Sequence, residues 1–123
     1  MAVASQNLDL VSGLTIVRDT DADGTSESNI NSGAGILHLV RLDNTANAAQ
    51  AVFLKLYNAT GPTIGTTVPD VVLRAAGGAV VQMAIMQGGV SFGTGISFAC
   101  VTAGGTGGTT NPTSDVVVAL TIE

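Results

Sequence analysis

The stretch AVFLKLY, residues 51–57, alternates aliphatic side chains with a more mixed set. One face of the alternation carries the aliphatic side chains of Val52, Leu54 and Leu56. The other face carries Ala51, Phe53, Lys55 and Tyr57. Because successive side chains of a β-strand point to opposite faces, this pattern predicts a half-buried strand with its aliphatic face toward a core.

Six further runs have the same character, and each is bounded by turn-forming residues. They are LTIVR (14–18), ILHLVRL (36–42), VVLRA (71–75), AVVQMAIM (79–86), ISFACVT (96–102) and DVVVALTI (115–122). Short runs rich in β-branched residues, at near-regular spacing, are typical of all-β proteins. We therefore predict an all-β fold, a single antiparallel β-sandwich that is jelly-roll-like and has about seven or eight short strands.

The length of 123 residues predicts one domain, 1–123. A domain of this size buries enough surface to fold without a disulfide, and the single cysteine has no partner within the chain. Residues 1–12 form either an extended N-terminal arm or a first strand. This segment lacks the basic and apolar regions of a secretory signal, so we do not expect it to be one.

Charge is scarce in this chain. Charged residues make up 11% of it, against about 25% in an average domain, and the net charge is −5. The four basic residues are scattered at Arg18, Arg41, Lys55 and Arg74. Without a basic cluster or an aromatic platform, nucleic-acid binding is not expected. The longest uncharged run, 75–114, is broken by glycines and polar residues, so we expect no membrane-spanning helix.

Two of the predicted strands are apolar on both faces. In DVVVALTI the two faces are Val116, Val118, Leu120 and Ile122 on one side and Val117, Ala119 and Thr121 on the other. In AVVQMAIM only Gln82 interrupts the apolar residues. A two-sheet sandwich covers one face of each strand, so we expect a second copy of the chain to cover the other. The alternative is burial under the chain's own long loops.

Two long loops are nearly free of charge. NATGPTIGTTVPD (58–70) and AGGTGGTTNPTSD (103–115) are rich in glycine, threonine and proline, and each carries only its final aspartate. Small neutral loops could lie flat on another protein. The alternative is simple flexibility.

The stretch DTDADG, residues 19–24, opens like a calcium-binding EF-hand loop, with aspartates at alternate positions followed by a glycine. In that template the twelfth position is a bidentate glutamate, but here it is Ile30. The flanking segments are also a predicted strand and a glycine-containing turn rather than helices. The sequence therefore does not predict an EF-hand.

Two interpretations of this acidic stretch remain. The first is a solvated turn between strands, in which aspartate and glycine support the turn and the charges point into water. The second is a weak Ca²⁺ site in which backbone carbonyls complete the coordination shell. Its candidate ligands are Asp19, Asp21, Asp23 and Glu27. We favour the turn.

No residues outside this stretch suggest catalysis. Cys100 lies in an apolar run and is predicted to be a small buried side chain. His38 alternates with aliphatic residues and is predicted to be a half-buried, hydrogen-bonded strand residue. The glycine-rich GGTGG, 104–108, lacks the GK[ST] ending and the following helix of a phosphate-binding loop. We therefore predict no enzymatic activity and no cofactor.

The central part of the chain resembles a known group of proteins. The sequence VFLKLYNATGPTIGTTVPDVVLRAAGGAV, followed by GGVSFGTGISFACVTAGG, is similar to small virion structural proteins of tailed bacteriophages. The matching parts are Lys55 to Asn58, Pro62 to Pro69 and Gly89 to Ser97. They consist of turn and strand residues, and the first 50 residues of the chain show no such similarity.

The resemblance implies a β-sandwich that acts as a capsid decoration, or cement, protein. Such a protein would bind the major capsid protein on the surface of the virion, as a homotrimer, after being made in the host cytoplasm. It would stabilise the head without an active site. A neck, tail or fibre-associated virion component is the alternative. A glycan-binding module is a third possibility, but its sites usually use aromatic platforms, and this chain has four aromatic residues.

Overall fold

The computed structural model describes residues 3–7, 13–85 and 87–123. Nine strands form in this part of the chain, and it contains no helix. They are β1 (Val3–Asn7), β2 (Thr15–Asp19), β3 (Gly35–Asp43), β4 (Val52–Asn58), β5 (Val71–Ala75), β6 (Val80–Ala84), β7 (Val90–Phe92), β8 (Ile96–Val101) and β9 (Val117–Ile122). All of their pairings are antiparallel. The predicted all-β sandwich is thus confirmed.

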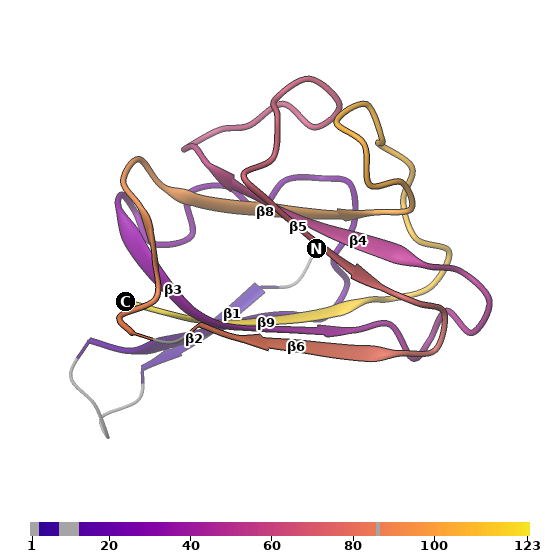
Figure 1. Ribbon diagram of the computed structural model, residues 1–123, viewed down its shortest axis with the longest axis horizontal. Helices are drawn as coiled ribbons and strands as arrows, with labels where there is room; N and C mark the ends of the chain where they lie inside the picture. The colour runs from indigo at the N-terminus through magenta and orange to yellow at the C-terminus, as the bar shows by residue number, and fades with distance from the viewer. Residues whose placement is uncertain (1–2, 8–12, 86) are drawn as a thin grey trace.

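The strands form two sheets, which Figure 1 shows as an upper and a lower layer. The lower, six-stranded sheet has the order β1-β2-β9-β3-β6, and β7 also pairs with β3. The upper, three-stranded sheet has the order β5-β4-β8. The C-terminal strand β9 therefore lies between β2 and β3, so formation of the larger sheet requires both ends of the chain.

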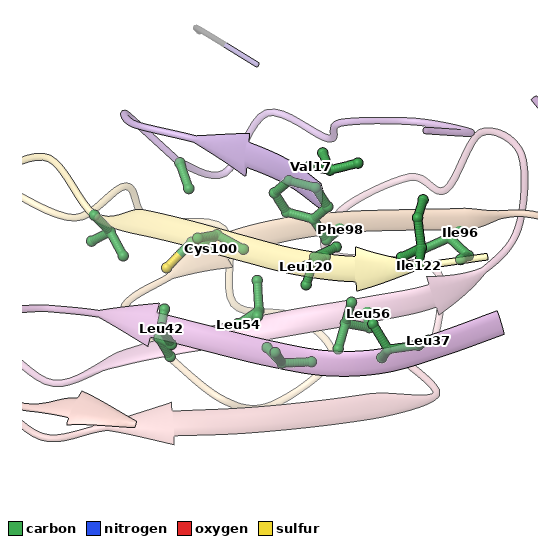
Figure 2. Packing of buried hydrophobic residues seen from close by; sticks show 14 of the residues in the cluster. Val17, Leu37, Leu42, Leu54, Leu56, Ile96, Phe98, Cys100, Leu120 and Ile122 are labelled. Carbon is green, nitrogen blue, oxygen red and sulfur yellow. The ribbon is translucent and has the colours of Figure 1, made fainter. Parts of the chain in front are cut away.

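The core fills the space between the two sheets. Figure 2 shows aliphatic and aromatic side chains of both layers meeting there, among them Leu54 and Phe98 from the small sheet and Leu120 and Leu37 from the large one. In β9, Val118, Leu120 and Ile122 are all buried. Their spacing of two residues is the strand period that the sequence shows, and the structure turns this one of the strand's two apolar faces toward the core.

The sequence predicted seven of the nine strands. The two additional strands are β1, within the segment described as an arm or a first strand, and β7, within a glycine-rich stretch predicted to be a turn. β7 has only three residues, so it gives too short a pattern to recognise. Residues 1–2 and 8–12 of the predicted arm, and Met86 of the predicted strand 79–86, lie outside the described residues.

The second face of β4 differs from the prediction. Lys55 and Tyr57 are completely buried rather than half-exposed. The ammonium nitrogen of Lys55 donates to the carbonyl oxygens of Gly105 and Gly108, at 2.6 and 3.0 Å. These carbonyls belong to the loop between β8 and β9, which folds over the outer side of the small sheet. The prediction of a half-exposed second face was wrong because the sequence of β4 does not show that the loop after β8 covers it.

The chain's own loops therefore form a layer outside the small sheet. Figure 1 shows the loops after β4 and after β8 above that sheet. The two loops approach each other closely, since a Cβ added at Gly65 would lie 2.7 Å from the methyl group of Thr109. A Cβ at Gly104 would likewise lie 2.7 Å from the Phe53 ring. The chain's own loops therefore bury the outer face of the small sheet, whereas the sequence raised such burial only for strands 79–86 and 115–122, which belong to the large sheet.

The outer side of the large sheet carries no comparable layer in the part of the chain that the structure describes. Val117, Ala119 and Thr121 of β9 are half-buried there. On β6 the alternate residues Val80 and Gln82 are exposed. The outward faces of β6 and β9, the two strands predicted to be apolar on both faces, are therefore not covered by other described parts of the chain.

Candidate functional site

The acidic stretch singled out from the sequence begins at the end of β2 and crosses from the large sheet to the small one. After the crossing it runs along β8. The Asp23 carbonyl accepts a hydrogen bond from the Cys100 amide at 2.8 Å, and Glu27 and Phe98 exchange two backbone hydrogen bonds of 2.9 and 3.0 Å. Segment 23–30 therefore occupies the outer edge of β8. It has a structural role that the sequence pattern did not reveal.

Asp19 is the most unusual residue of this stretch. It is the last residue of β2 and points inward, with 0% of its surface exposed. Its Oδ1 accepts a hydrogen bond from the Asp21 amide at 3.1 Å, whereas its Oδ2 has no hydrogen-bond partner among the residues that the structure describes. Burial raises the pKa of Asp19 to about 7, and the nearby carboxyl groups of Asp21 and Glu27 act in the same direction. The expectation that this charge points into water is wrong for Asp19.

The rest of the stretch is a turn held by side chains. Asp23 Oδ1 accepts a hydrogen bond from the Thr25 amide at 2.7 Å, as Asx turns do. The Gly24 amide donates to Asn111 Oδ1 at 2.9 Å. A Cβ at Gly24 would lie 2.7 Å from that oxygen and 2.8 Å from the Thr109 carbonyl oxygen, so the loop after β8 packs tightly against this turn.

The four candidate calcium ligands do not converge. Among the described residues, no group of three or more His, Cys, Asp or Glu side chains is arranged to hold a metal ion. Asp19 faces the interior, Asp23 caps the turn, and burial raises the pKa of Glu27. This geometry fits the turn better than a coordination shell made by Asp19, Asp21, Asp23 and Glu27.

A pocket of about 200 Å³ lies beside the turn. Its walls come from residues 21–23 on one side and from residues 111–115 on the other. Three of the lining residues are aspartates: Asp21, Asp23 and Asp115. The pocket is therefore polar and acidic, and it forms where the two loops meet.

Cys100 and His38 lie in separate parts of the fold. Cys100 is completely buried, and burial raises the pKa of its thiol to about 12, so it remains protonated at neutral pH. His38 is the extra residue of a β-bulge in β3, and its Nε2 lies 3.1 Å from Glu123 Oε2. Both predictions, a buried cysteine and a half-buried, hydrogen-bonded histidine, are confirmed.

The glycine-rich GGTGG segment interacts with a cation. Its carbonyl groups at Gly105 and Gly108 accept both hydrogen bonds from Lys55. A phosphate-binding loop instead directs backbone N–H groups at its ligand. The segment therefore fastens a loop to the small sheet.

Exposed apolar residues make up the remaining candidate surface. The large hydrophobic side chains exposed in the structure are Val3, Val68, Val72, Val80 and Val90. Val68, in the neutral loop after β4, is the most exposed of them at 69%. Isolated exposed valines are common on soluble proteins, so their significance depends on what surrounds each one.

No protein-family model, curated protein or solved structure matches this chain. Among the residues that the structure describes, there is no helix long and apolar enough to cross a membrane.

Proposed function

We propose that this chain is a non-enzymatic structural protein of a bacteriophage particle, which decorates the capsid surface and stabilises the head. The proposal rests on the resemblance of the central segment to small virion proteins. The fold is compatible with it, because a β-sandwich with little charge offers neutral surfaces for contact with other subunits. The partners would be the major capsid protein and further copies of this chain.

One observation carries the proposal. Two of the three stretches of sequence that resemble virion proteins, Lys55 to Asn58 and Gly89 to Ser97, meet at Asn58, the last residue of β4. Asp70, which directly follows the third stretch, is also bonded to Asn58. Asn58 Oδ1 accepts hydrogen bonds from the Thr94 and Gly95 amides at 2.8 and 3.4 Å, and the Asn58 amide donates to Asp70 Oδ2 at 2.6 Å. The resemblance therefore covers one end of the sandwich as a connected unit, which favours a shared structure over a chance similarity of strand residues.

The same end of the molecule presents a suitable contact surface. The loop after β4 carries no charge between Asn58 and Asp70, and its most exposed apolar residue is Val68. We place the contact with the capsid here. Many copies bound to a repeating lattice would turn modest individual contacts into stable clamping of neighbouring capsomers.

Glycan binding has less support. Tyr57, Phe92 and Phe98 are buried, and Phe53 lies beneath the backbone of Gly104. The four aromatic residues of the chain therefore offer no exposed platform for a sugar ring.

The copy number in purified particles tests the proposal. Quantitative gel densitometry against the major capsid protein should give hundreds of copies per particle for a decoration protein. About a dozen copies would instead indicate the neck or tail component, and complete absence from particles would overturn both. Adding the Val68→Asp variant to particles stripped of the protein should give weaker binding than the wild type, with Val90→Asp, on β7 of the large sheet, as an equally polar control.

A further inference from the structure

The open edge of β6 can be identified from its hydrogen bonds. β6 pairs with β3 on one side only, and no other strand in the described chain pairs with its second side. Ala79, before the strand, accepts a hydrogen bond from the Asn44 amide, and Ile85, after it, donates to the His38 carbonyl. Residues two apart in a strand direct their backbone groups to the same side, so residues 79, 81, 83 and 85 face β3.

The intervening residues face the other way. The N–H and C=O groups of Val80, Gln82 and Ala84 therefore point away from β3, to the outer edge of the sheet. All three side chains are exposed. No hydrogen bond of these backbone groups to the rest of the described chain is present.

This edge lacks the features that usually prevent edge-to-edge association. Natural edge strands carry lysine, proline or a bulge, or are covered by other parts of the chain. β6 has the sequence VVQMA and pairs with β3 in unbroken register. The edge of β8 shows the contrast, because segment 23–30 covers it. On β5, the neighbouring edge strand of the small sheet, Arg74 points outward.

We propose that β6 pairs antiparallel with β6 of a second copy of this chain, about a two-fold axis through Gln82. In this register Gln82 lies opposite Gln82 of the partner subunit, and Val80 lies opposite the partner's Ala84. Each of these pairs exchanges two N–H···O bonds, because the groups that pair are those already facing outward. The two large sheets then become one continuous sheet.

The side chains in this register are self-complementary. Val81 lies opposite the partner's Met83, and both side chains already pack partly buried against the core. In the dimer each would cover part of the surface that the other leaves exposed. The strand has no charged residue, so the symmetric pairing brings no like charges together. A second copy is therefore the occupant that fits this edge.

The inference goes beyond the proposed function and can be tested independently of it. It concerns the isolated protein in solution, whereas capsid binding is assigned to the loop that carries Val68. It also replaces the three-fold arrangement implied by the resemblance with a two-fold one. A failure here would leave the capsid assignment standing, and the reverse is also true.

The test measures mass in solution by light scattering over a range of concentrations. The wild type should reach twice the 12.2 kDa of one chain. Gln82→Lys and Gln82→Glu each place like charges together on the two-fold axis and should weaken the dimer more than about tenfold. An equimolar mixture of the two variants should restore dimers, because lysine then faces glutamate. Val68→Lys, in the exposed loop after β4, should leave the dimer unchanged.

Unfolding of each variant by heat is followed alongside, so that a misfolded variant is not mistaken for a dissociated one. Four outcomes would overturn the proposal. Two concern the wild type: it stays monomeric at all concentrations, or it forms a trimer insensitive to both substitutions. The other two concern the variants: Gln82→Lys folds and remains dimeric, or the mixture fails to restore dimers.

Discussion

The ammonium nitrogen of Lys55 lies 2.6 Å from the carbonyl oxygen of Gly105, which is 50 residues away in the sequence. This buried cation has backbone carbonyls rather than a carboxylate as its partners, and burial lowers its pKa. The contact closes a glycine-rich loop over the small sheet and gives that sheet a third layer made from the same chain.

Replacing Lys55 with methionine should release this loop. The substitution keeps an apolar stem but leaves the carbonyls of Gly105 and Gly108 without their donor, which costs about 1–3 kcal/mol of folding stability. Urea unfolding measures the loss, and amide hydrogen exchange should show faster opening of residues 102–110. Arg18→Met, at an exposed cation, serves as the control and should change stability by less than about 0.5 kcal/mol. Equal stability of the two variants would contradict the role given to Lys55.

Stability should fall as the pH rises from about 4 to about 7, because of Asp19. Its pKa is about 7 in the folded protein, against an ordinary value of 3.8, so the folded state holds a proton that the unfolded state releases. The stabilisation is therefore complete below pH 3.8 and is lost as the pH rises through 7. The difference corresponds to roughly 3–5 kcal/mol. Glu27, whose pKa burial also raises, contributes in the same direction.

Asp19→Asn tests this assignment, because asparagine resembles the protonated carboxyl group and does not titrate. The variant should be more stable than the wild type above pH 7, and its stability should depend less on pH between 4 and 7. Urea unfolding at a series of pH values provides the measurement. Unchanged pH dependence in Asp19→Asn would show that other groups are responsible. Asp115→Asn, at an exposed aspartate before β9, is a suitable comparison.

Asn58→Ala should loosen the end of the sandwich where the virion-like segments meet. The change removes the acceptor for the Thr94 and Gly95 amides, at an expected cost of about 1–3 kcal/mol. Asn58→Asp keeps an acceptor oxygen and should lose less. Hydrogen exchange of residues 93–97 reports on the same contact. If alanine and aspartate behave identically, the acceptor is not the important feature.

Calcium should not stabilise the folded protein measurably at millimolar concentration, because the candidate ligands do not converge. Isothermal titration and thermal unfolding with and without Ca²⁺ test this expectation. A saturable heat that disappears when Asp21 and Asp23 are both replaced by alanine would reinstate the calcium site.

Cys100 should be unreactive toward a thiol reagent in the native protein and should react once urea unfolds it. Its complete burial and the raised pKa of its thiol are the reasons. Rapid modification under native conditions would show that the core between β4 and β9 opens readily.

Strands could be predicted from the sequence where the two-residue period lies within one short segment. β9 could be recognised because Val118, Leu120 and Ile122 repeat at the strand period, and the same period gave the inward face of β4. The burial of Lys55 could not be foreseen, because its cover comes from a loop 50 residues away and neither segment alone indicates the contact. The number of strands was underestimated for a simpler reason, since β7 has only three residues.

The burial of Asp19 could have been predicted. Val17 and Asp19 are two residues apart in β2, so a strand that buries one must direct the other to the same side. The path of segment 23–30 along β8, in contrast, depends on backbone pairing that no side-chain pattern encodes.

The loop layer over Lys55 also determines how the molecule meets its surroundings on that side. The chain's buried ammonium group is enclosed by the layer, and the outer surface there consists mainly of glycine, threonine and proline. Contacts formed by such a surface depend on shape and on main-chain hydrogen bonds, with almost no fixed charge for dissolved ions to screen. The affinity of a complex formed there would therefore depend little on the salt concentration.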